Sequence, residues 1–114
     1  MTEPEQLTLH HGPLAFSATA MGSGPTVLCL HGFPDNAESF RHQLPFLAEN
    51  GNRAVAVTLR GYEPSSIPAD GDYSMQALVS DVVAWVEELG GASDLGQVHI
   101  IGHDWGAAIT YSAA

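Results

Sequence analysis

Apolar residues along the chain follow two periods, one typical of strands and one typical of helices. Near the start, residues 6–11 and 14–20 alternate loosely between apolar and polar positions on either side of Gly12-Pro13. This pattern predicts a pair of short antiparallel strands joined by a tight turn. Three continuous apolar runs are typical of strands covered on both faces of a sheet: 26–30, 53–59 and 97–101.

Helical spacing lies between these runs. The segment from Ser39 to Asn50 places Phe40, Leu44 and Leu47 on one side, and Asn50-Gly51 is a stop signal. The final stretch, "WGAAITYSAA" (105–114), is also predicted to be helical.

A longer helix is predicted to begin after Ser74, which is a good N-cap residue, and to close at Gly90-Gly91. Its apolar stripe repeats at steps of three and four residues: Leu78, Val82, Trp85, Val86 and Leu89. Strands that alternate with helices at this spacing form parallel β-α-β units. The sequence therefore predicts an α/β fold with a mostly parallel sheet, an antiparallel N-terminal hairpin and helices on both faces.

Composition and charge exclude several function classes. The chain has 114 residues, with 45% hydrophobic and 14% charged, which is typical of one globular domain. Its net charge of −10 arises from thirteen acids against three arginines, and it has no lysine. Nucleic acid and anionic membrane surfaces need clustered positive charge, so we expect neither as a partner.

The single cysteine, Cys29, lies inside an apolar run, and we expect a buried structural thiol there. Adjacent His10 and His11 would point to opposite faces of a strand, and no ligand-spaced set accompanies them, so we expect neither a metal nor a cofactor. The acidic start lacks the basic region of a signal peptide, and no apolar stretch approaches a membrane span. We expect a cytoplasmic protein, and the sequence leaves its oligomeric state open.

The motif "GHDWG" (102–106) places Asp104 between a predicted strand and a predicted helix, with glycines two residues before and after. Such glycines allow a sharp strand-to-helix turn that exposes the central side chain as a nucleophile. The following helix N-terminus favours an anion. A second element, "HGFPD" (31–35), follows the 26–30 strand. A loop there can bring the Phe33 amide beside the Trp105 amide, and two convergent amides form an oxyanion hole.

These motifs, with the loop "RGYEPSS" (60–66), resemble the α/β-hydrolase family and within it the epoxide hydrolase branch. The resemblance implies that Asp104 is the catalytic nucleophile and that Phe33 and Trp105 supply the oxyanion-hole amides. It implies that residues 1–114 form the N-terminal portion of a single hydrolase domain, without its lid and C-terminal part. Glu63 departs from the family pattern, which tends to have Gly there, in a loop whose role we expect to be structural.

An ionised aspartate narrows the substrate. Attack on an ester or amide carbonyl would give a reactive anhydride, whereas attack on a saturated carbon with a leaving group gives a stable alkyl ester. The substrate is therefore expected to be a small apolar epoxide or alkyl halide, and water then cleaves the ester. In haloalkane dehalogenases, which resemble the chain nearly as well, the position of Phe33 often holds a polar Asn that helps bind halide. Epoxide opening is favoured for that reason.

The proposed chemistry also needs a histidine base, an acid that orients it and lid proton donors. None of the six histidines present fits the role of base, and His31 is expected to orient its own loop. In the family these groups follow the last strands, so we expect this chain alone to be inactive. The alternative is a truncated, non-catalytic chain whose strand at 97–101 leaves an unpaired sheet edge and causes poor solubility or oligomerisation.

Overall fold

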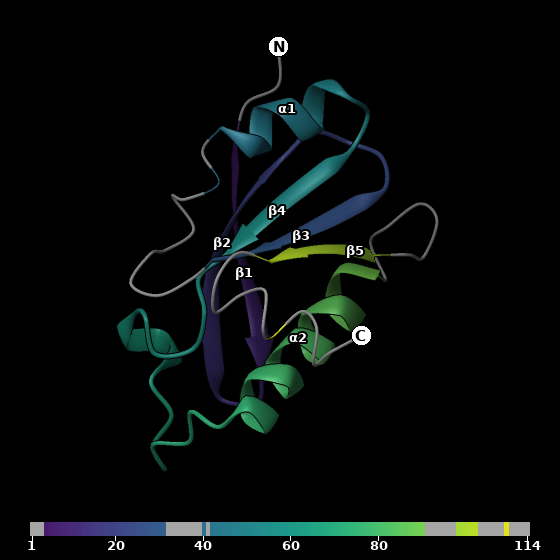
Figure 1. The fold of residues 1–114 in the computed structure, drawn as a ribbon. Helices are drawn as coiled ribbons and strands as arrows, with labels where there is room; N and C mark the ends of the chain where they lie inside the picture. The colour runs from purple at the N-terminus through teal and green to yellow at the C-terminus, as the bar shows by residue number, and fades with distance from the viewer. Residues whose placement is uncertain (1–3, 32–39, 41, 91–97, 103–108, 110–114) are drawn as a thin grey trace.

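The computed structural model describes residues 4–31, 40, 42–90, 98–102 and 109. Within them a five-stranded sheet has the order β1-β2-β4-β3-β5 (Figure 1). The strands are β1 (Glu5–His11), β2 (Leu14–Met21), β3 (Thr26–Leu30), β4 (Arg53–Val57) and β5 (Val98–Gly102). The helices are α1 (Gln43–Glu49), the short 3₁₀ helix η2 (Pro64–Ser66) and α2 (Met75–Gly90).

The N-terminal hairpin is confirmed. β1 and β2 pair antiparallel from Glu5↔Ala20 to His11↔Leu14, which leaves Gly12 and Pro13 as a two-residue turn. Gly12 has φ 58°, a conformation that a hairpin turn needs and that glycine adopts without strain. β2 then pairs antiparallel with β4, while β3 pairs parallel with both β4 and β5. The sheet is therefore mixed, with three parallel strands at one side.

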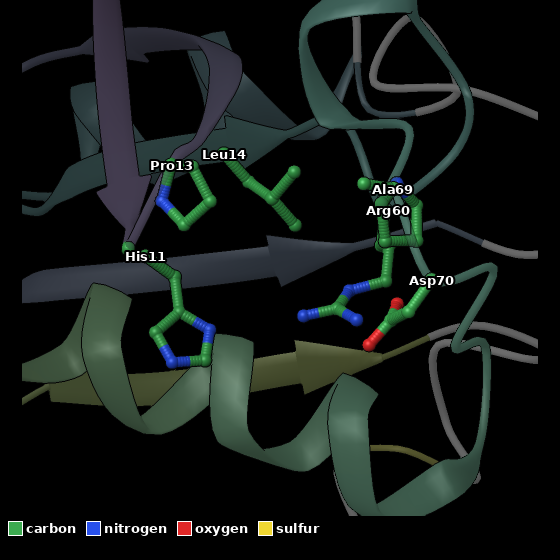
Figure 2. A pocket seen from close by; sticks show the side chains of 8 residues that line it. His11, Pro13, Leu14, Arg60, Ala69 and Asp70 are labelled. Carbon is green, nitrogen blue, oxygen red and sulfur yellow. The ribbon is translucent and has the colours of Figure 1, made fainter.

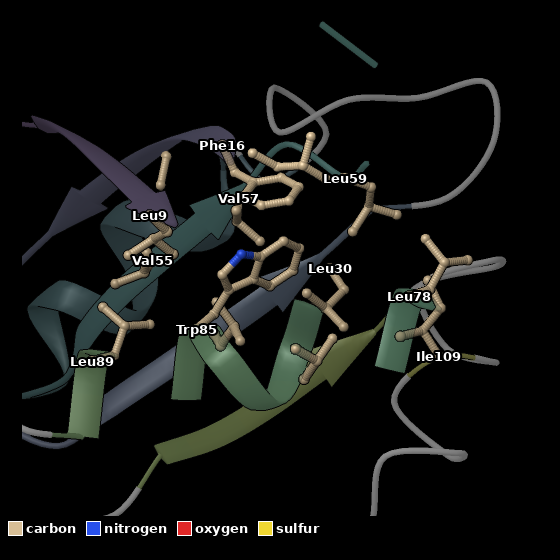
Figure 3. Packing of buried hydrophobic residues seen from close by; sticks show 14 of the residues in the cluster. Leu9, Phe16, Leu30, Val55, Val57, Leu59, Leu78, Trp85, Leu89 and Ile109 are labelled. Carbon is tan, nitrogen blue, oxygen red and sulfur yellow. The ribbon is translucent and has the colours of Figure 1, made fainter. Parts of the chain in front are cut away.

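Of the two α-helices in the described part of the chain, α2 packs against one face of the sheet and α1 against the other. In the larger core, α2 presents its apolar stripe to one face, and Trp85 lies edge-on to Phe16 with ring centroids 4.9 Å apart (Figure 3). On the other face, Phe40 and Leu44 pack against Val27 and Cys29. The α/β class with helices on both faces is confirmed, and so is the burial of Cys29.

The start of α2 agrees with the sequence prediction. The Ser74 hydroxyl oxygen accepts a hydrogen bond from the Ala77 backbone N–H at 3.1 Å, and the Ser74 carbonyl accepts one from the Leu78 N–H at 3.0 Å. Ser74 is thus the N-cap, because its side chain satisfies an amide that has no partner inside the helix.

The predicted start of α1 at Ser39 is wrong. The α-helix begins at Gln43, while Phe40 lies in a 3₁₀ turn. Proline has no N–H to donate and fits only the first turn of a helix. A helix from Ser39 would place Pro45 in its interior, whereas a start at Gln43 places it third.

Two strand predictions need correction. β4 ends at Val57 rather than residue 59, because the Leu59 N–H donates to the side chain of His31 instead of continuing the ladder. The 97–101 segment is a strand, but it is not covered on both faces: His99 is exposed and Ile101 is 41% exposed. Among the described strands β5 pairs only with β3, and the cover that α1 provides over β3 does not extend to β5.

Close backbone packing holds the α1–β4 turn against the β2–β3 turn. Gly24 has φ 118°, and a Cβ added there would collide with the carbonyl oxygen of Gly51. Gly12 also has a positive φ, but a Cβ there would meet nothing within 4 Å.

We expect Gly12→Ala to lower the free energy of unfolding by about 1–2 kcal/mol, because it adds only left-handed backbone strain. Gly24→Ala adds a backbone collision to the strain, and we expect a loss of about 3 kcal/mol or more. Urea unfolding followed by circular dichroism measures both variants. Equal losses would contradict the close packing of these two turns.

Candidate active site

The carboxyl ends of the three parallel strands meet at one edge of the sheet. Leu30, the last residue of β3, pairs with Val57 of β4 on one side and with Gly102 of β5 on the other. The chain leaves β3 through α1 to reach β4, then crosses through α2 to the opposite side of β3. Such a reversal of strand order is where open α/β sheets bind ligands, in the crevice beyond the strand ends.

All three residues predicted for catalysis follow these strand ends. Phe33 comes three residues after Leu30, while Asp104 and Trp105 come two and three residues after Gly102. Phe33, Asp104 and Trp105 lie outside the described residues. The structure therefore brings together the strand ends from which both motifs start, and the roles of the three residues stay predictions. Of the helix predicted over 105–114, Ile109 alone is described; it is helical and fully buried in the larger core.

His31, the first residue beyond β3, is fully buried at this edge. Its Nε2 accepts a hydrogen bond from the Leu59 backbone N–H at 3.0 Å. Its ring also meets the Tyr62 ring edge-on, with centroids 4.7 Å apart and planes at 77°. His31 thus joins the segment that follows β3 to the loop that follows β4.

A buried ion pair fixes the loop after β4 on α2. Arg60 donates from Nε and Nη2 to the two carboxylate oxygens of Asp81, both at 2.8 Å, and from Nη1 to the Asp72 carbonyl at 2.8 Å. Asp81 is fully buried and Arg60 is 8% exposed. The bond to Asp81 raises the pKa of Arg60 above its usual value, so this guanidinium stays charged. His11 approaches the same carboxylate, with its Nδ1 2.7 Å from Asp81 Oδ1.

Sequence reasoning missed this ion pair, although one signal was available. Asp81 follows Leu78 by three residues and precedes Trp85 by four, so it lies on the apolar stripe of a helix. A carboxylate in such a position requires a buried partner. The chain has only three arginines to provide one.

Hydrogen bonds to Glu63 hold the loop containing "RGYEPSS" on β2, which agrees with the structural role expected of it. Glu63 Oε1 accepts hydrogen bonds from the Ser17 backbone N–H at 3.0 Å, from the Ser17 hydroxyl at 2.8 Å and from the Ser65 hydroxyl at 3.0 Å. The residue that departs from the family pattern therefore ties the loop to β2.

A pocket of about 300 Å³ lies between the hairpin turn and this loop (Figure 2). His11, Leu14, Arg60 and Asp70 are among the residues that line it. Asp81 and Asp72 already take up hydrogen bonds from all three guanidinium nitrogens of Arg60. Arg60 therefore has little capacity left to bind an anion in this pocket. The hairpin strands β1 and β2, beside which the pocket lies, are at the opposite side of the sheet from β5.

Among the described residues, no group of three or more histidine, cysteine or acidic side chains could hold a metal ion. None of the described helices is long and apolar enough to cross a membrane.

Comparison with known proteins places these features in a family. Residues 25–114 match the model of the α/β hydrolase fold. The chain is 39% identical over 112 residues to epoxide hydrolase 3 of Siraitia grosvenorii, covering 97% of this chain and 34% of that protein. It is 43% identical over 95 residues to bifunctional epoxide hydrolase 2 of Sus scrofa, covering 82% and 16%. A crystal structure of an epoxide hydrolase from Vigna radiata superposes with a TM-score of 0.87 at 39% identity, covering 97% and 34%.

The chain belongs to the α/β hydrolase family. Its relatives at this level of similarity include epoxide hydrolases from plants and mammals. The chain spans about a third of the length of the plant relatives.

Removing Arg60 takes both bidentate hydrogen bonds from the buried Asp81 carboxylate and leaves only the His11 ring beside it. We expect Arg60→Met to lower the free energy of unfolding by about 3 kcal/mol, since Asp81 would remain buried. The double variant Arg60→Met/Asp81→Leu is expected to recover most of that loss. Glu5→Gln, which breaks the exposed Arg53–Glu5 pair, is the control and should change stability little. Thermal or urea unfolding checks all three, and a single variant as stable as the control would contradict the expectation.

Burial raises the pKa of the Cys29 thiol to about 11. At pH 8 the thiol in the folded protein is therefore almost entirely protonated, and we expect very slow alkylation of Cys29 by iodoacetamide. In urea the same reagent should modify it completely. Intact mass spectrometry measures the extent of alkylation with and without urea. Rapid alkylation without urea would contradict the burial of Cys29 in β3.

Proposed function

We propose that the protein carrying this chain hydrolyses epoxides to diols through a covalent ester on Asp104. The observation that carries the proposal is the pairing of Leu30 with Gly102, because this pair aligns the ends of the two strands that precede "HGFPD" and "GHDWG". The names of the relatives, which cover nearly the whole chain at about 40% identity, support epoxides as the substrate class.

In the first step, a carboxylate oxygen of Asp104 attacks one carbon of the epoxide ring. The bond from that carbon to the ring oxygen breaks, and the oxygen leaves as an alkoxide that takes a proton from an acid. Tyrosines of a lid beyond residue 114 are the proposed donors. The product of this step is an alkyl ester of Asp104 that carries a hydroxyl on the neighbouring carbon.

In the second step, a histidine base from beyond residue 114 removes a proton from water, and the water oxygen attacks the carbonyl carbon of the ester. The developing negative charge falls on an oxygen of Asp104 itself, and the amides of Phe33 and Trp105 stabilise it. The bond between that carbon and the alkyl oxygen then breaks, and the alkyl oxygen takes the proton from the protonated histidine, which releases the diol. The acid left on residue 104 gives its proton to the donor that was deprotonated in the first step, which regenerates the carboxylate. The new hydroxyl oxygen of the diol therefore comes from Asp104.

A haloalkane substrate is less well supported. A departing halide needs N–H or other polar donors, and Phe33 contributes no polar side chain to the loop after β3. The relatives reported above are named as epoxide hydrolases.

The experiment begins with the intact mass of the protein purified from its native source. A mass far above 12.0 kDa allows the assay to proceed with the whole product, whereas a mass of 12.0 kDa would leave Asp104 without a base and contradict the proposal. We expect Asp104→Ala to abolish diol formation from a small apolar epoxide. Glu87→Gln, an exposed substitution on α2, should keep full activity.

A single turnover with excess enzyme in H₂¹⁸O separates the ester mechanism from direct attack by water. The ester mechanism places the label on Asp104 and releases an unlabelled diol in the first turnover. Label in the first diol would show that water attacks the epoxide directly and would refute the covalent route.

A further inference from the structure

We propose that Glu88 guards the outer edge of β1, and that its removal lets the β1 strand of a second copy of the protein pair with this edge. In the described part of the chain, β1 is the outermost strand on its side of the sheet. An outermost strand presents backbone N–H and C=O groups that another strand can bind, and natural proteins protect such edges with charged side chains. The proposed role concerns association between molecules and is independent of the proposed reaction.

The hairpin register decides which residues of β1 present their backbone outward. His11 and Leu14 flank a two-residue turn, and a turn of this length is closed by a hydrogen-bonded pair. Hydrogen-bonded and non-hydrogen-bonded pairs then alternate along an antiparallel ladder. His10, Thr8 and Gln6 therefore direct their N–H and C=O groups away from β2.

The contacts of β2 agree with this assignment. Thr8 lies opposite Ser17 in the register. The Ser17 carbonyl accepts a hydrogen bond from the Thr58 N–H at 2.9 Å, so the backbone of Ser17 is directed toward the β4 side of β2. The two residues of a non-hydrogen-bonded pair face away from each other, so the backbone of Thr8 faces the outer edge.

Glu88, in the last turn of α2, covers one of the three outward positions. Its Oε1 accepts a hydrogen bond from the His10 backbone N–H at 2.9 Å, and its Oε2 lies 3.4 Å from His10 Nδ1. Because α2 packs on the face of the sheet to which Leu9 points (Figure 1), Glu88 reaches the strand edge from that face. Among the described residues, no acceptor binds the outward N–H of Thr8 or Gln6.

The carboxylate opposes strand addition in two ways. A second strand would have to take the His10 amide from Glu88, and a hydrogen bond to a carboxylate is stronger than the neutral bond that would replace it. The displaced carboxylate would also lie beside the carbonyl oxygens of the incoming strand, where like charges repel. Both costs arise at an end of the outward row formed by Gln6, Thr8 and His10.

The side chains of β1 match a second copy of the same strand. In an antiparallel pair centred on Thr8, Leu7 of one copy lies opposite Leu9 of the other, and Glu5 lies opposite His11. Apolar pairs and pairs of an acid with a basic side chain stabilise neighbouring strands. The same register places Gln6 opposite His10, so every outward backbone group of the three positions gains a partner. A second copy of the protein is therefore the occupant that this edge fits.

The test uses the native-length protein and the variant Glu88→Ala. Alanine is the best helix former, so we expect the variant to fold, and circular dichroism checks this. Sedimentation equilibrium measures self-association. We expect dimerisation to become tighter by about tenfold or more, because neither copy then gives up a hydrogen bond to a carboxylate. In hydrogen exchange, the amides of β1 should become protected as the concentration of Glu88→Ala rises.

Three further variants identify the cause of any association. Glu87→Ala removes the same charge from an exposed neighbouring position and keeps the bond to His10, so it should behave as wild type. Glu88→Gln keeps a side-chain oxygen that can accept from His10, and we expect weaker association than in Glu88→Ala. Glu88→Ala/Thr8→Pro removes the central outward N–H, which an edge strand tolerates, and should return association to the wild-type level.

Wild-type association in folded Glu88→Ala would overturn the inference. An equal gain in Glu87→Ala would overturn it too, because net charge alone would then control association. If Glu88→Ala/Thr8→Pro associates as tightly as Glu88→Ala, the molecules meet through another surface and the role assigned to β1 is wrong. If Glu88→Gln associates as tightly as Glu88→Ala, the hydrogen bond to His10 is not what guards the edge.

Discussion

The central strand β3 is the element on which the rest of the structure depends. All five of its residues are buried, and both of its edges are hydrogen-bonded, one to β4 and one to β5. A slip of one residue would turn every side chain of β3 to the opposite face and would exchange the contacts made to α1 and α2. The packing of two separate cores therefore selects one register. The same register sets Leu30 level with Val57 and Gly102, so the alignment of strand ends at the candidate site is a consequence of core packing.

The buried Arg60–Asp81 pair gives a different kind of constraint. Burial of two charges costs desolvation energy that their attraction only partly recovers, so the pair is a weak source of net stability. Its geometry is specific, however, because two parallel bonds of 2.8 Å fix both the position and the tilt of the guanidinium. Apolar contacts have no preferred direction, whereas these hydrogen bonds do. The ion pair therefore ties the loop after β4 to one place on α2, and the same loop brings Leu59 and Tyr62 to His31.

Local sequence patterns predicted those parts of the fold that depend on local chemistry. The hairpin follows from Gly12-Pro13, the core face of α2 from its apolar stripe, and its start from Ser74. The errors arose at two element boundaries. Pro45 is not compatible with a helix that begins at Ser39, so α1 begins at Gln43. β4 ends at Val57 because the Leu59 N–H donates to the side chain of the distant His31. No periodic signal joins His31 to Leu59 or Arg60 to Asp81, since these partners are 28 and 21 positions apart. For the site, sequence motifs predict the roles of Phe33, Asp104 and Trp105, while the described residues add the alignment of the strands that precede them.

The fold and the proposed nucleophile restrict the function independently of one another. The sheet edge beyond β3 and β5 can host many reactions, because an α/β sheet fixes where a ligand binds and leaves open what happens to it. The residue at position 104 adds the chemical restriction. A serine there would need a base before it could attack, and a carbonyl would be its natural target. An aspartate attacks without a base and forms a stable product only at saturated carbon. The base is then needed for the second step alone.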